Sequence, residues 1–296
     1  MEMLETCPIC NQSDLRTTLS CRDYTASGET FNIQACSHCG FHLTNPRPLA
    51  DELQRYYDSP SYISHSNTSA NLIDKIYKLA RTFTLRWKYK LVLRHASPKP
   101  ATLLDYGCGT GYFLAYCKEH GLTVSGVEPN PQARAEAARQ VGNNIYSDIN
   151  EIKQPSDIIT LWHVLEHVHN LHQTIQDLSG KLNPHGTLVI AVPNHNSRDA
   201  QDYQDYWAAY DVPRHLWHFS RSTMKRLLEQ NHLTIKAVLP MPLDAYYVSL
   251  LSEKYRRGSH TIPGIIRAIR KGWISNRNAS KTSEYSSLIY IATKLS

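Results

Sequence analysis

Short apolar runs alternate with segments of helical periodicity from residue 101 onward. Such runs are typical of strands that are buried on both faces of a parallel sheet. Strands are predicted at 102–106, 123–127, 157–162 and 187–192, with a shorter one at 145–146. The alternation of these strands with helices predicts an α/β fold.

Two later runs extend this sheet. Residues 234–239 and 287–293 predict strands, and a long insertion over 241–286 separates them. The predicted helix starts agree with the alternation, because Asn130 precedes a proline as an N-cap and Ser220 can cap a later helix. We expect the two last strands to pair at one edge of the sheet and close the domain.

An amphipathic helix is predicted ahead of the first strand, because apolar residues recur there at steps of three and four. The apolar stripe consists of Leu72, Ile76, Leu79, Phe83, Trp87 and Leu91. Lys75, Lys78, Arg81, Arg86, Lys88 and Lys90 lie mostly off the stripe. We expect these basic residues to form a solvated face.

The character of the sequence changes near Pro60 and again near Pro98 to Pro100, and these two places are candidate boundaries. They divide the chain into a leader over 1–60, a helical connector over 61–97 and a domain over 98–296, whose insertion 241–286 is a candidate lid. With 41% hydrophobic residues among 296, the chain can bury one sizeable core beside a small module.

The location of the protein is predicted from what the sequence lacks. No apolar run reaches the ~18 to 20 residues that cross a bilayer, and the first residues lack the apolar region of a signal peptide. We therefore expect a cytoplasmic protein with reduced thiols. Four of its seven Cys form two close pairs, which favours metal ligation over disulfides.

The net charge of +6 is local. Residues 254–281 hold eight basic side chains and no acid, whereas residues 1–60 hold four Arg against eight acids. An acidic leader is a poor phosphate-binding surface, which argues against nucleic acid as a partner.

The two cysteine pairs predict a structural Zn²⁺ site. Cys7 and Cys10 form one C-x-x-C knuckle, and Cys36 and Cys39 form the other, followed by Gly40. Four thiolates at this spacing fill a tetrahedral site and leave no open position. The alternative is a set of reduced thiols or a redox pair; Cys21, His38 and His42 are lesser ligand candidates.

A glycine-rich turn follows the first strand of the main domain. Gly107, Gly109 and Gly111 occupy alternate positions after Asp105, so the backbone can approach a ligand closely. The spacing differs from that of a dinucleotide fingerprint. Glu128 ends the next strand, where a carboxylate can bind both ribose hydroxyls, and Asp148 at the third strand end lies within reach of an adenine amino group. These features predict an adenosine-type ligand.

The chain resembles the class I S-adenosylmethionine-dependent methyltransferases over roughly residues 100 to 296. The resemblance rests on the D-x-G-x-G-x-G loop at 105–111, Glu128, the pair Asp148–Ile149 and the stretch 165–168 (Leu-Glu-His-Val). It implies a Rossmann-like sheet of seven strands with the last one antiparallel. It also implies that the loop holds the methionine end of the cofactor, Glu128 the ribose and Asp148 the adenine.

The expected cofactor site comprises Asp105, Gly107, Cys108, Gly109, Gly111, Glu128, Pro129, Asp148, Ile149, Trp162 and His163. The leader, with 45–48 (Asn-Pro-Arg-Pro) and 62–65 (Tyr-Ile-Ser-His), resembles the zinc-binding leader of some bacterial small-molecule methyltransferases. The implied activity is methyl transfer to a small-molecule acceptor, such as a sugar, a quinone-like compound or a lipid-linked metabolite.

Methyl transfer by in-line displacement requires positioning and, for a protonated acceptor, a base. His215 is the candidate base and Arg214 the candidate anchor for an anionic acceptor, because both follow the fifth strand. The alternative is that His215 and His218 stack in a structural corner with Trp217 and Phe219.

A divalent metal is a further alternative. His163, Glu166 and His167 share one face if a helix starts at the end of the fourth strand. The stretch resembles the E-x-x-E-H metal site of ubiquinone-pathway O-methyltransferases, but His163 replaces the first Glu, which disfavours magnesium. We expect Glu166 and His167 to cap and pack the turn, His163 to line the adenine side of the cofactor, and turnover to be metal-independent.

Two other functions compete with small-molecule methylation. One is an RNA methyltransferase that binds RNA through the zinc module. The acidic leader and the lack of an Asn/Asp-Pro-Pro-Tyr signature at 161–164 argue against this function. A non-catalytic cofactor-binding module is the other.

The basic insertion places five apolar residues on helical steps over 262–273. This pattern predicts either peripheral contact with an anionic membrane or a lipid-linked acceptor, or a lid.

Overall fold

The computed structural model describes residues 1–57, 72–96, 99–259 and 261–295; side chains are described from Thr82 onward in the first long helix. Segment 62–65, part of the resemblance of the leader, lies outside the described residues. The strands are β1 (Leu15–Arg22), β2 (Thr30–Cys36), β3 (His42–Thr44), β4 (Thr102–Tyr106), β5 (Thr123–Val127), β6 (Ile145–Tyr146), β7 (Ser156–Trp162), β8 (Leu182–Pro193), β9 (Trp217–His218), β10 (Leu233–Pro240) and β11 (Ser287–Lys294).

The helices flank these strands in the predicted alternation. They are α2 (Leu72–His95), α3 (Tyr112–Glu119), α4 (Pro131–Val141), α5 (Leu171–Gly180), α6 (Arg198–Tyr203), α7 (Arg221–Gln230), α8 (Asp244–Arg257) and α9 (Ile262–Thr282), with short 3-10 turns between them. The side chain of Asn130 caps α4 and that of Ser220 caps α7, as predicted.

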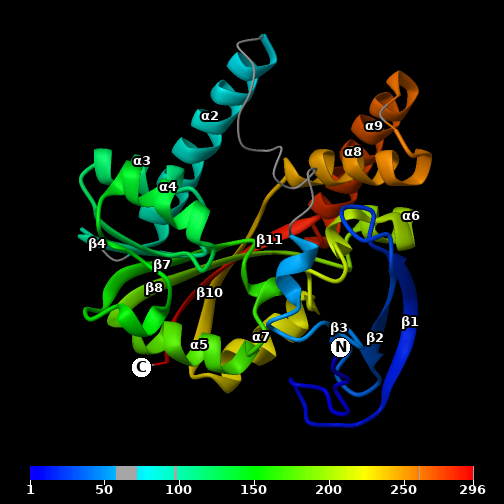
Figure 1. The fold of residues 1–296 in the computed structure, drawn as a ribbon, viewed down its shortest axis with the longest axis horizontal. Coiled ribbons are helices and arrows are strands. Elements are labelled where there is room, and N and C mark those ends of the chain that lie inside the picture. Colours follow the sequence, from blue (N-terminus) through cyan, green and yellow to red (C-terminus); the bar gives the residue numbers. More distant parts are fainter. Residues whose placement is uncertain (58–71, 97–98, 260, 296) are drawn as a thin grey trace.

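Seven strands form the main sheet in the order β10-β11-β8-β7-β4-β5-β6 (Figure 1). The pairs from β8 to β6 are parallel, whereas β11 runs antiparallel to both β8 and β10. This confirms the predicted Rossmann-like fold. The carboxyl ends of β4, β5 and β7 meet at one edge, since Asp105 pairs in register with both Gly126 and Thr160.

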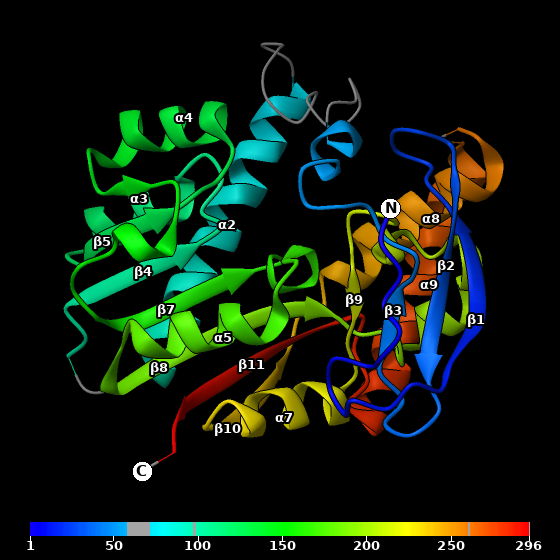
Figure 2. The same cartoon turned by 60° about the horizontal axis from the view of Figure 1, so that its bottom comes forward.

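Helices cover both faces of the main sheet (Figure 2). Helices α2, α3 and α4 pack on one face and α5 and α7 on the other. Successive strand residues serve opposite faces: Ile158 joins the core under α3, and Ile159 joins the core under α5. Both faces of these strands are covered, which explains why the runs lack a regular polar alternation.

The leader is joined to the main domain by a second sheet. Its order is β1-β2-β3-β9, and β9 belongs to the segment between β8 and α7. Leu43 of β3 pairs with Trp217 of β9, and the Thr44 hydroxyl donates to the carbonyl of His215 at 2.7 Å. The leader therefore completes its sheet with a strand that lies about 170 residues further along the chain.

A buried ion-pair network holds this junction. The guanidinium of Arg214 is fully buried and donates to Asp23 at 3.0 Å, to Asp211 at 2.6 Å and to the carbonyl of Tyr56 at 3.0 Å. The pKa of the Asp23 carboxyl is lowered: burial opposes the charge, but Arg214 and backbone donors outweigh burial. Burying a charge of this kind is tolerable only because its partners are all present.

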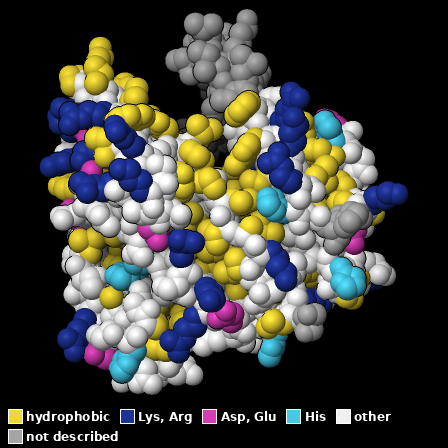
Figure 3. Space-filling model, turned by 180° about the vertical axis from the view of Figure 1, so that it is seen from behind, with side chains coloured by type: hydrophobic (Ala, Val, Ile, Leu, Met, Phe, Trp, Pro, Cys, Tyr) yellow, Lys and Arg dark blue, Asp and Glu magenta, His cyan; other side chains and the backbone are white. Residues whose placement is uncertain are grey.

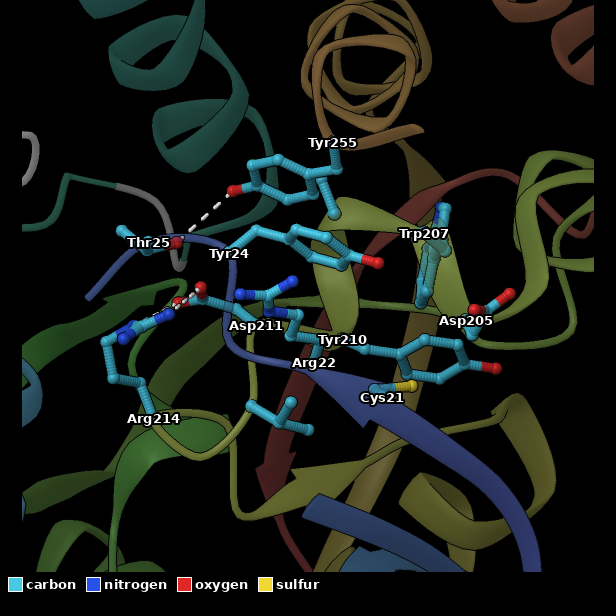
Figure 4. Close-up of a pocket in the computed structure, with 12 residues that line it drawn as sticks. Cys21, Arg22, Tyr24, Thr25, Asp205, Trp207, Tyr210, Asp211, Arg214 and Tyr255 are labelled. Carbon is cyan, nitrogen blue, oxygen red and sulfur yellow. Dashed lines mark hydrogen bonds and ion pairs between the residues drawn. The ribbon is translucent and has the colours of Figure 1, made fainter. Parts of the chain in front are cut away.

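Aromatic rings pack beside this network (Figure 4). Tyr24 of the leader stacks on Tyr255 of α8 at 4.8 Å between ring centroids and on Tyr206 at 5.7 Å. Tyr24 and Tyr255 also line a cavity of only about 10 Å³, enough for one water molecule but not for a substrate. The junction is thus a packed interface between the leader, the segment after β8 and the insertion.

The insertion folds as two packed helices, α8 and α9. Gly264 and Gly272 weaken the predicted helix, yet α9 is continuous from Ile262 to Thr282. At Gly272, a Cβ atom would lie 2.8 Å from the ring of Tyr246, so the absence of a side chain permits α9 to approach α8 closely. Within the described residues, no helix combines the length and apolar character needed to cross a membrane.

We predict that Asp23→Ala lowers the free energy of unfolding by about 3 to 5 kcal/mol, because it leaves the buried Arg214 without one of its two carboxylates. Urea unfolding measures this change. Asp14→Ala is the matched control, because Asp14 pairs with Arg16 in the same leader at an exposed position, and its midpoint should stay near that of the wild type. Equal midpoints for the two variants would contradict the role assigned to Arg214.

Candidate cofactor and acceptor site

The turn between β4 and α3 needs glycine for different reasons at different positions. Gly107 and Gly109 have φ values of +74° and +55°, in the left-handed region. A Cβ atom on Gly107 would lie 2.5 Å from the side chain of Val164, whereas one on Gly109 would meet no atom within 4 Å. Gly107 therefore permits close packing, and Gly109 exposes bare backbone to open space.

Glu128 holds this turn in place from the end of β5. Its carboxylate accepts the N–H of Gly109 at 2.8 Å and the N–H of Asn130 at 2.9 Å. The carbonyl of Val127 accepts the N–H groups of Gly107 and Cys108. The predicted acid therefore lies against the predicted loop, although the two are separated by almost twenty residues.

A cleft of about 490 Å³ opens between the glycine turn and α2. It is lined by Thr84, Leu85, Lys88, Asp105, Gly107, Cys108, Gly109, Thr110, Tyr112, Phe113 and Trp162. Five of the predicted cofactor residues are among them. The indole Nε1 of Trp162 is buried and has no hydrogen-bond partner among the described residues.

The other predicted cofactor residues lie outside this lining. Gly111 packs on α4, where a Cβ atom would lie 2.9 Å from Ala137. Asp148 is exposed and caps the short turn after β6 by accepting the N–H of Asn150 at 2.7 Å, while Ile149 is buried in the core. Pro129 is exposed beside Glu128, and His163 follows Trp162 at the end of β7.

Lys88 was predicted to be part of a solvated face, and the structure corrects this. It is half-buried, lines the cleft, and its ammonium lies 4.3 Å from the ring centre of Trp162. Burial lowers its pKa, although Asp105 and Asp244 favour the charged form. Among the described side chains that line the cleft, Lys88 is the only Lys or Arg. No sequence signal marks it, because only the packing of α2 across the turn brings it there.

Asp105 lies beneath the cleft. Its carboxyl is almost completely buried and accepts the hydroxyl of Thr160 at 2.6 Å. Burial raises its pKa to about 7, despite the hydrogen bond from Thr160 and the charge of Lys88. Asp105 therefore couples the end of β4 to β7 directly under the turn.

His163 connects the cleft to the insertion. Its Nδ1 lies 3.3 Å from Glu166 and its Nε2 lies 3.1 Å from Asp244, the first residue of α8. Burial opposes its protonation, but hydrogen bonds to Asp244 and Glu166 outweigh it and raise the pKa to about 10. His163 also adopts φ +57°, a backbone conformation that is uncommon for a residue with a side chain.

The predicted face of His163, Glu166 and His167 does not form. Only a short 3-10 turn, Leu165–His167, follows β7, so the α-helical spacing that the prediction assumed is absent. The Nδ1 of His167 lies 2.9 Å from the hydroxyl of Tyr57 and 3.0 Å from the carbonyl of Arg214. Glu166 and His167 instead approach His215, with ligand atoms within 4.8 Å of one another. Burial and the neighbouring His215 lower the pKa of His167 to about 4.

Arg214 and His215 lie in the junction and do not line the cleft. Among the described residues, the Arg214 guanidinium donates to the leader and to Asp211, so this side chain is not placed to anchor an anionic acceptor, contrary to the prediction. His215 is 8% exposed and stands edge-on to His167, with 4.5 Å between ring centroids. Its Nδ1 lies 2.8 Å from the carbonyl of Ala209 and therefore donates to that carbonyl.

The four predicted zinc ligands converge in the leader. Their sulfur atoms all lie within 4.8 Å of one another, with 3.5 Å between Cys7 and Cys39 and 3.4 Å between Cys10 and Cys36. Cys21 lies apart, at the junction cavity, and His42 bonds the carbonyl of Gly40. The C-x-x-C spacing therefore identified the four cysteines that the fold brings together.

The sheet order and the glycine turn define the class of α/β proteins to which the solved methyltransferases belong. Residues 74–238 match the family described as a methyltransferase domain, and the chain belongs to this family. The magnesium protoporphyrin IX methyltransferase of Synechocystis, solved with bound S-adenosylhomocysteine, has a similar fold at a TM-score of 0.51 and 13% identity, covering 81% of this chain and 96% of that one.

Curated relatives match shorter stretches. A ubiquinone biosynthesis O-methyltransferase of Rickettsia felis is 28% identical over 32% of this chain and 43% of its own length. A malonyl-[acyl-carrier protein] O-methyltransferase of Enterobacter lignolyticus is 28% identical over 42% of this chain and 51% of its own. The chain thus spans about half the length of the curated relatives that it matches.

We predict that Asp244→Asn lowers the pKa of His163 and destabilises the protein in a pH-dependent way. Because the folded pKa of about 10 exceeds the ordinary value of 6.5, the stabilisation is complete below pH 6.5 and is lost as the pH rises through 10. The difference in melting temperature between wild type and variant should therefore be largest near pH 6 and shrink toward pH 10.

Thermal unfolding over this pH range and NMR titration of the imidazoles measure the effect. Asp202→Asn is the control, because Asp202 pairs with Arg198 and Lys271 and with no His. Its destabilisation should stay constant between pH 6 and 10. A constant difference for Asp244→Asn as well would contradict the link between Asp244 and His163.

Proposed function

We propose that the chain is an S-adenosylmethionine-dependent methyltransferase that acts on a small-molecule acceptor. The observation that carries this proposal is the cleft over Gly109, where the bare backbone of Gly109 meets open space and the side chains of Lys88 and Trp162 line the wall. The names of the curated relatives, which are O-methyltransferases of ubiquinone biosynthesis and of malonyl-acyl carrier protein, support an acceptor outside the nucleic acids.

The chemistry of the cleft fits the cofactor in two respects. The methionine end of S-adenosylmethionine carries a carboxylate, which the ammonium of Lys88 can bind in this partly desolvated site. The ribose hydroxyls require an acceptor at the end of β5, and Glu128 is the acid there. In this arrangement Glu128 would bind the ribose while it holds the N–H of Gly109.

The cofactor supplies an electrophilic methyl group, so the protein has to orient the acceptor and remove its proton. His163 is a poor base because two carboxylates keep it protonated. We propose His215 as the base, because its ring stands 4.5 Å from that of His167 and a ring nitrogen lies within 4.8 Å of the carboxylate of Glu166, just after β7. A divalent ion is not part of this proposal.

We also propose that the four leader thiolates bind one structural Zn²⁺. A tetrahedron with Zn–S bonds of about 2.3 Å places its sulfur atoms about 3.8 Å apart, close to the distances between the two cysteine pairs. Such an ion would fix the end of β2 next to β3 and so hold the strand that pairs with β9.

We predict that Glu128→Ala weakens binding of S-adenosylhomocysteine by about 1.5 to 3 kcal/mol, the worth of charged hydrogen bonds. Lys88→Ala should also lower the affinity, because it removes the cation in the cleft. Isothermal calorimetry measures both, with Glu136→Ala on the adjacent α4 as a control that retains wild-type affinity.

The activity itself is tested with methyl-labelled S-adenosylmethionine and a fractionated cell extract, followed by mass analysis of the labelled product. Wild type and Glu136→Ala should label the same small molecule, and Glu128→Ala should label much less of it. Unchanged affinity in both Glu128→Ala and Lys88→Ala would refute the cofactor site, and label found in RNA would refute the acceptor class.

We predict one zinc per chain by elemental analysis of protein purified without added metal. Cys36→Ser combined with Cys39→Ser should lose the zinc and lower the melting temperature, because the leader loses a cross-link between β2 and its neighbours. Cys21→Ala, a thiol outside the cluster, should keep the full zinc content. Zinc-free wild-type protein that melts as a single cooperative unit would overturn this assignment.

A further inference from the structure

Helix α9 places its bulky apolar side chains on the outside. Its buried positions are Gly264, Ala268, Gly272, Ser275 and Ala279, which are all small. The exposed positions on the opposite side include Ile262, Ile265, Ile266, Ile269 and Trp273, which are 40 to 76% exposed. We call these five residues the α9 stripe. The arrangement inverts the usual amphipathic helix, which buries its bulky apolar face.

Contacts on the inner side fix this orientation. The hydroxyl of Ser275 donates to the buried Asp199 at 2.6 Å, and Lys271 pairs with Asp202 of α6 at 2.7 Å. Gly272 packs against Tyr246 so closely that no side chain fits between them. A rotation of α9 that buried the stripe would break all three contacts, so the exposed apolar face is built into the fold.

The charges around the stripe have a single sign. Helix α9 contains Arg267, Arg270, Lys271, Arg277 and Lys281 and no acid. Arg267 and Lys271 pair with acids of neighbouring helices, whereas Arg270, Arg277 and Lys281 are exposed. The guanidinium of Arg277 lies 5.2 Å from the ring centre of Trp273, so aromatic and cationic groups share one surface.

The apolar surface continues onto α8. Asn276 of α9 donates to the carbonyl of Pro242, and the next residue, Leu243, is 61% exposed. Tyr247, one turn further along α8, is 54% exposed. In Figure 3, seen from behind, hydrophobic side chains gather on the upper part of the molecule with Lys and Arg side chains among and below them.

We propose that the α9 stripe docks on the surface of an anionic phospholipid membrane. An apolar face about three turns long with Ile and Trp at its centre and cations at its sides is the composition of helices that lie in the interface plane of a bilayer. Anionic lipids attract each exposed Lys or Arg near the surface. A second copy of the chain fits less well, because two α9 helices without acids would repel each other.

This docking does not depend on the proposed methyl transfer, because it requires only α8 and α9. It does place a membrane beside the cofactor cleft: α8 begins at Asp244, which pairs with His163 next to Trp162 of the cleft. An acceptor embedded in the bilayer would therefore be presented from the side of the insertion.

Sedimentation with vesicles tests the proposal on the full chain. Vesicles of phosphatidylcholine with phosphatidylglycerol should carry the protein into the pellet, and vesicles of phosphatidylcholine alone should carry much less. Two double variants probe the stripe: Ile266→Ser with Ile269→Ser removes apolar surface, and Arg270→Glu with Lys281→Glu reverses charge. Each should lower the partition coefficient about tenfold or more, and added NaCl should mimic the second.

The matched control is Arg221→Glu with Arg226→Glu, which makes the same charge change at exposed positions of α7. This control should partition within about twofold of the wild type. The proposal is overturned if the wild type stays in the supernatant with anionic vesicles, or if the α7 control loses as much binding as the α9 variants. A dimer in analytical ultracentrifugation that the Ile266→Ser, Ile269→Ser protein no longer forms, without vesicle binding, would assign the stripe to a second copy instead. Cofactor affinity, measured in parallel, should be unchanged in all variants.

Discussion

The buried guanidinium of Arg214 is the interaction on which the arrangement of the leader depends. A charge in this position has no access to water, so its energy is acceptable only while Asp23, Asp211 and the carbonyl of Tyr56 remain in place. Two of these partners come from the leader and one from the segment after β8. The network therefore fixes the leader in one position relative to the segment after β8. Apolar packing alone would define this position less well.

That placement determines the environment of the residues after β7. With the leader seated against the segment after β8, Thr44 bonds the carbonyl of His215 and Tyr57 bonds the ring of His167. The imidazole of His167 thereby loses water, which favours its neutral form. His163, only four residues before His167, faces the insertion and is kept protonated by Asp244 and Glu166. The two sides of one short loop thus hold imidazoles in opposite charge states.

The sequence was informative where a local geometric requirement limits the residue type. The glycine turn and the C-x-x-C knuckles are of this kind, because left-handed backbone and tetrahedral ligation demand particular residues at particular spacings. The strands of the main domain were predicted from short apolar runs, because a strand that is covered on both faces of a sheet is apolar on both sides. The number of seven strands was an implication of the resemblance to the methyltransferases.

The sequence was uninformative where the partner lies far along the chain. Arg214 was predicted to bind the acceptor, whereas it binds Asp23, which lies 191 residues earlier. Nothing in the sequence indicates that these two residues are in contact. Lys88 was assigned to solvent because helical periodicity cannot show that a loop crosses the helix at that point. The prediction that His163, Glu166 and His167 share one helix face was wrong, because a 3-10 turn stands where the spacing assumed an α-helix.

The inverted helix α9 shows how such a partner can reverse the meaning of a pattern. Its Ile and Trp residues recur at helical steps, and that recurrence alone would assign them to the core. The small residues on the other side carry the decisive constraint, because Gly272 and Ser275 must contact Tyr246 and Asp199. Once those contacts form, the apolar residues have no protein surface left to cover among the described residues. Asp244 at the start of α8 pairs with His163, which follows Trp162 of the cleft. A membrane bound to the α9 stripe would therefore contact the same pair of helices that lies against His163. The insertion therefore joins an outward apolar surface to the cofactor cleft through one ion pair.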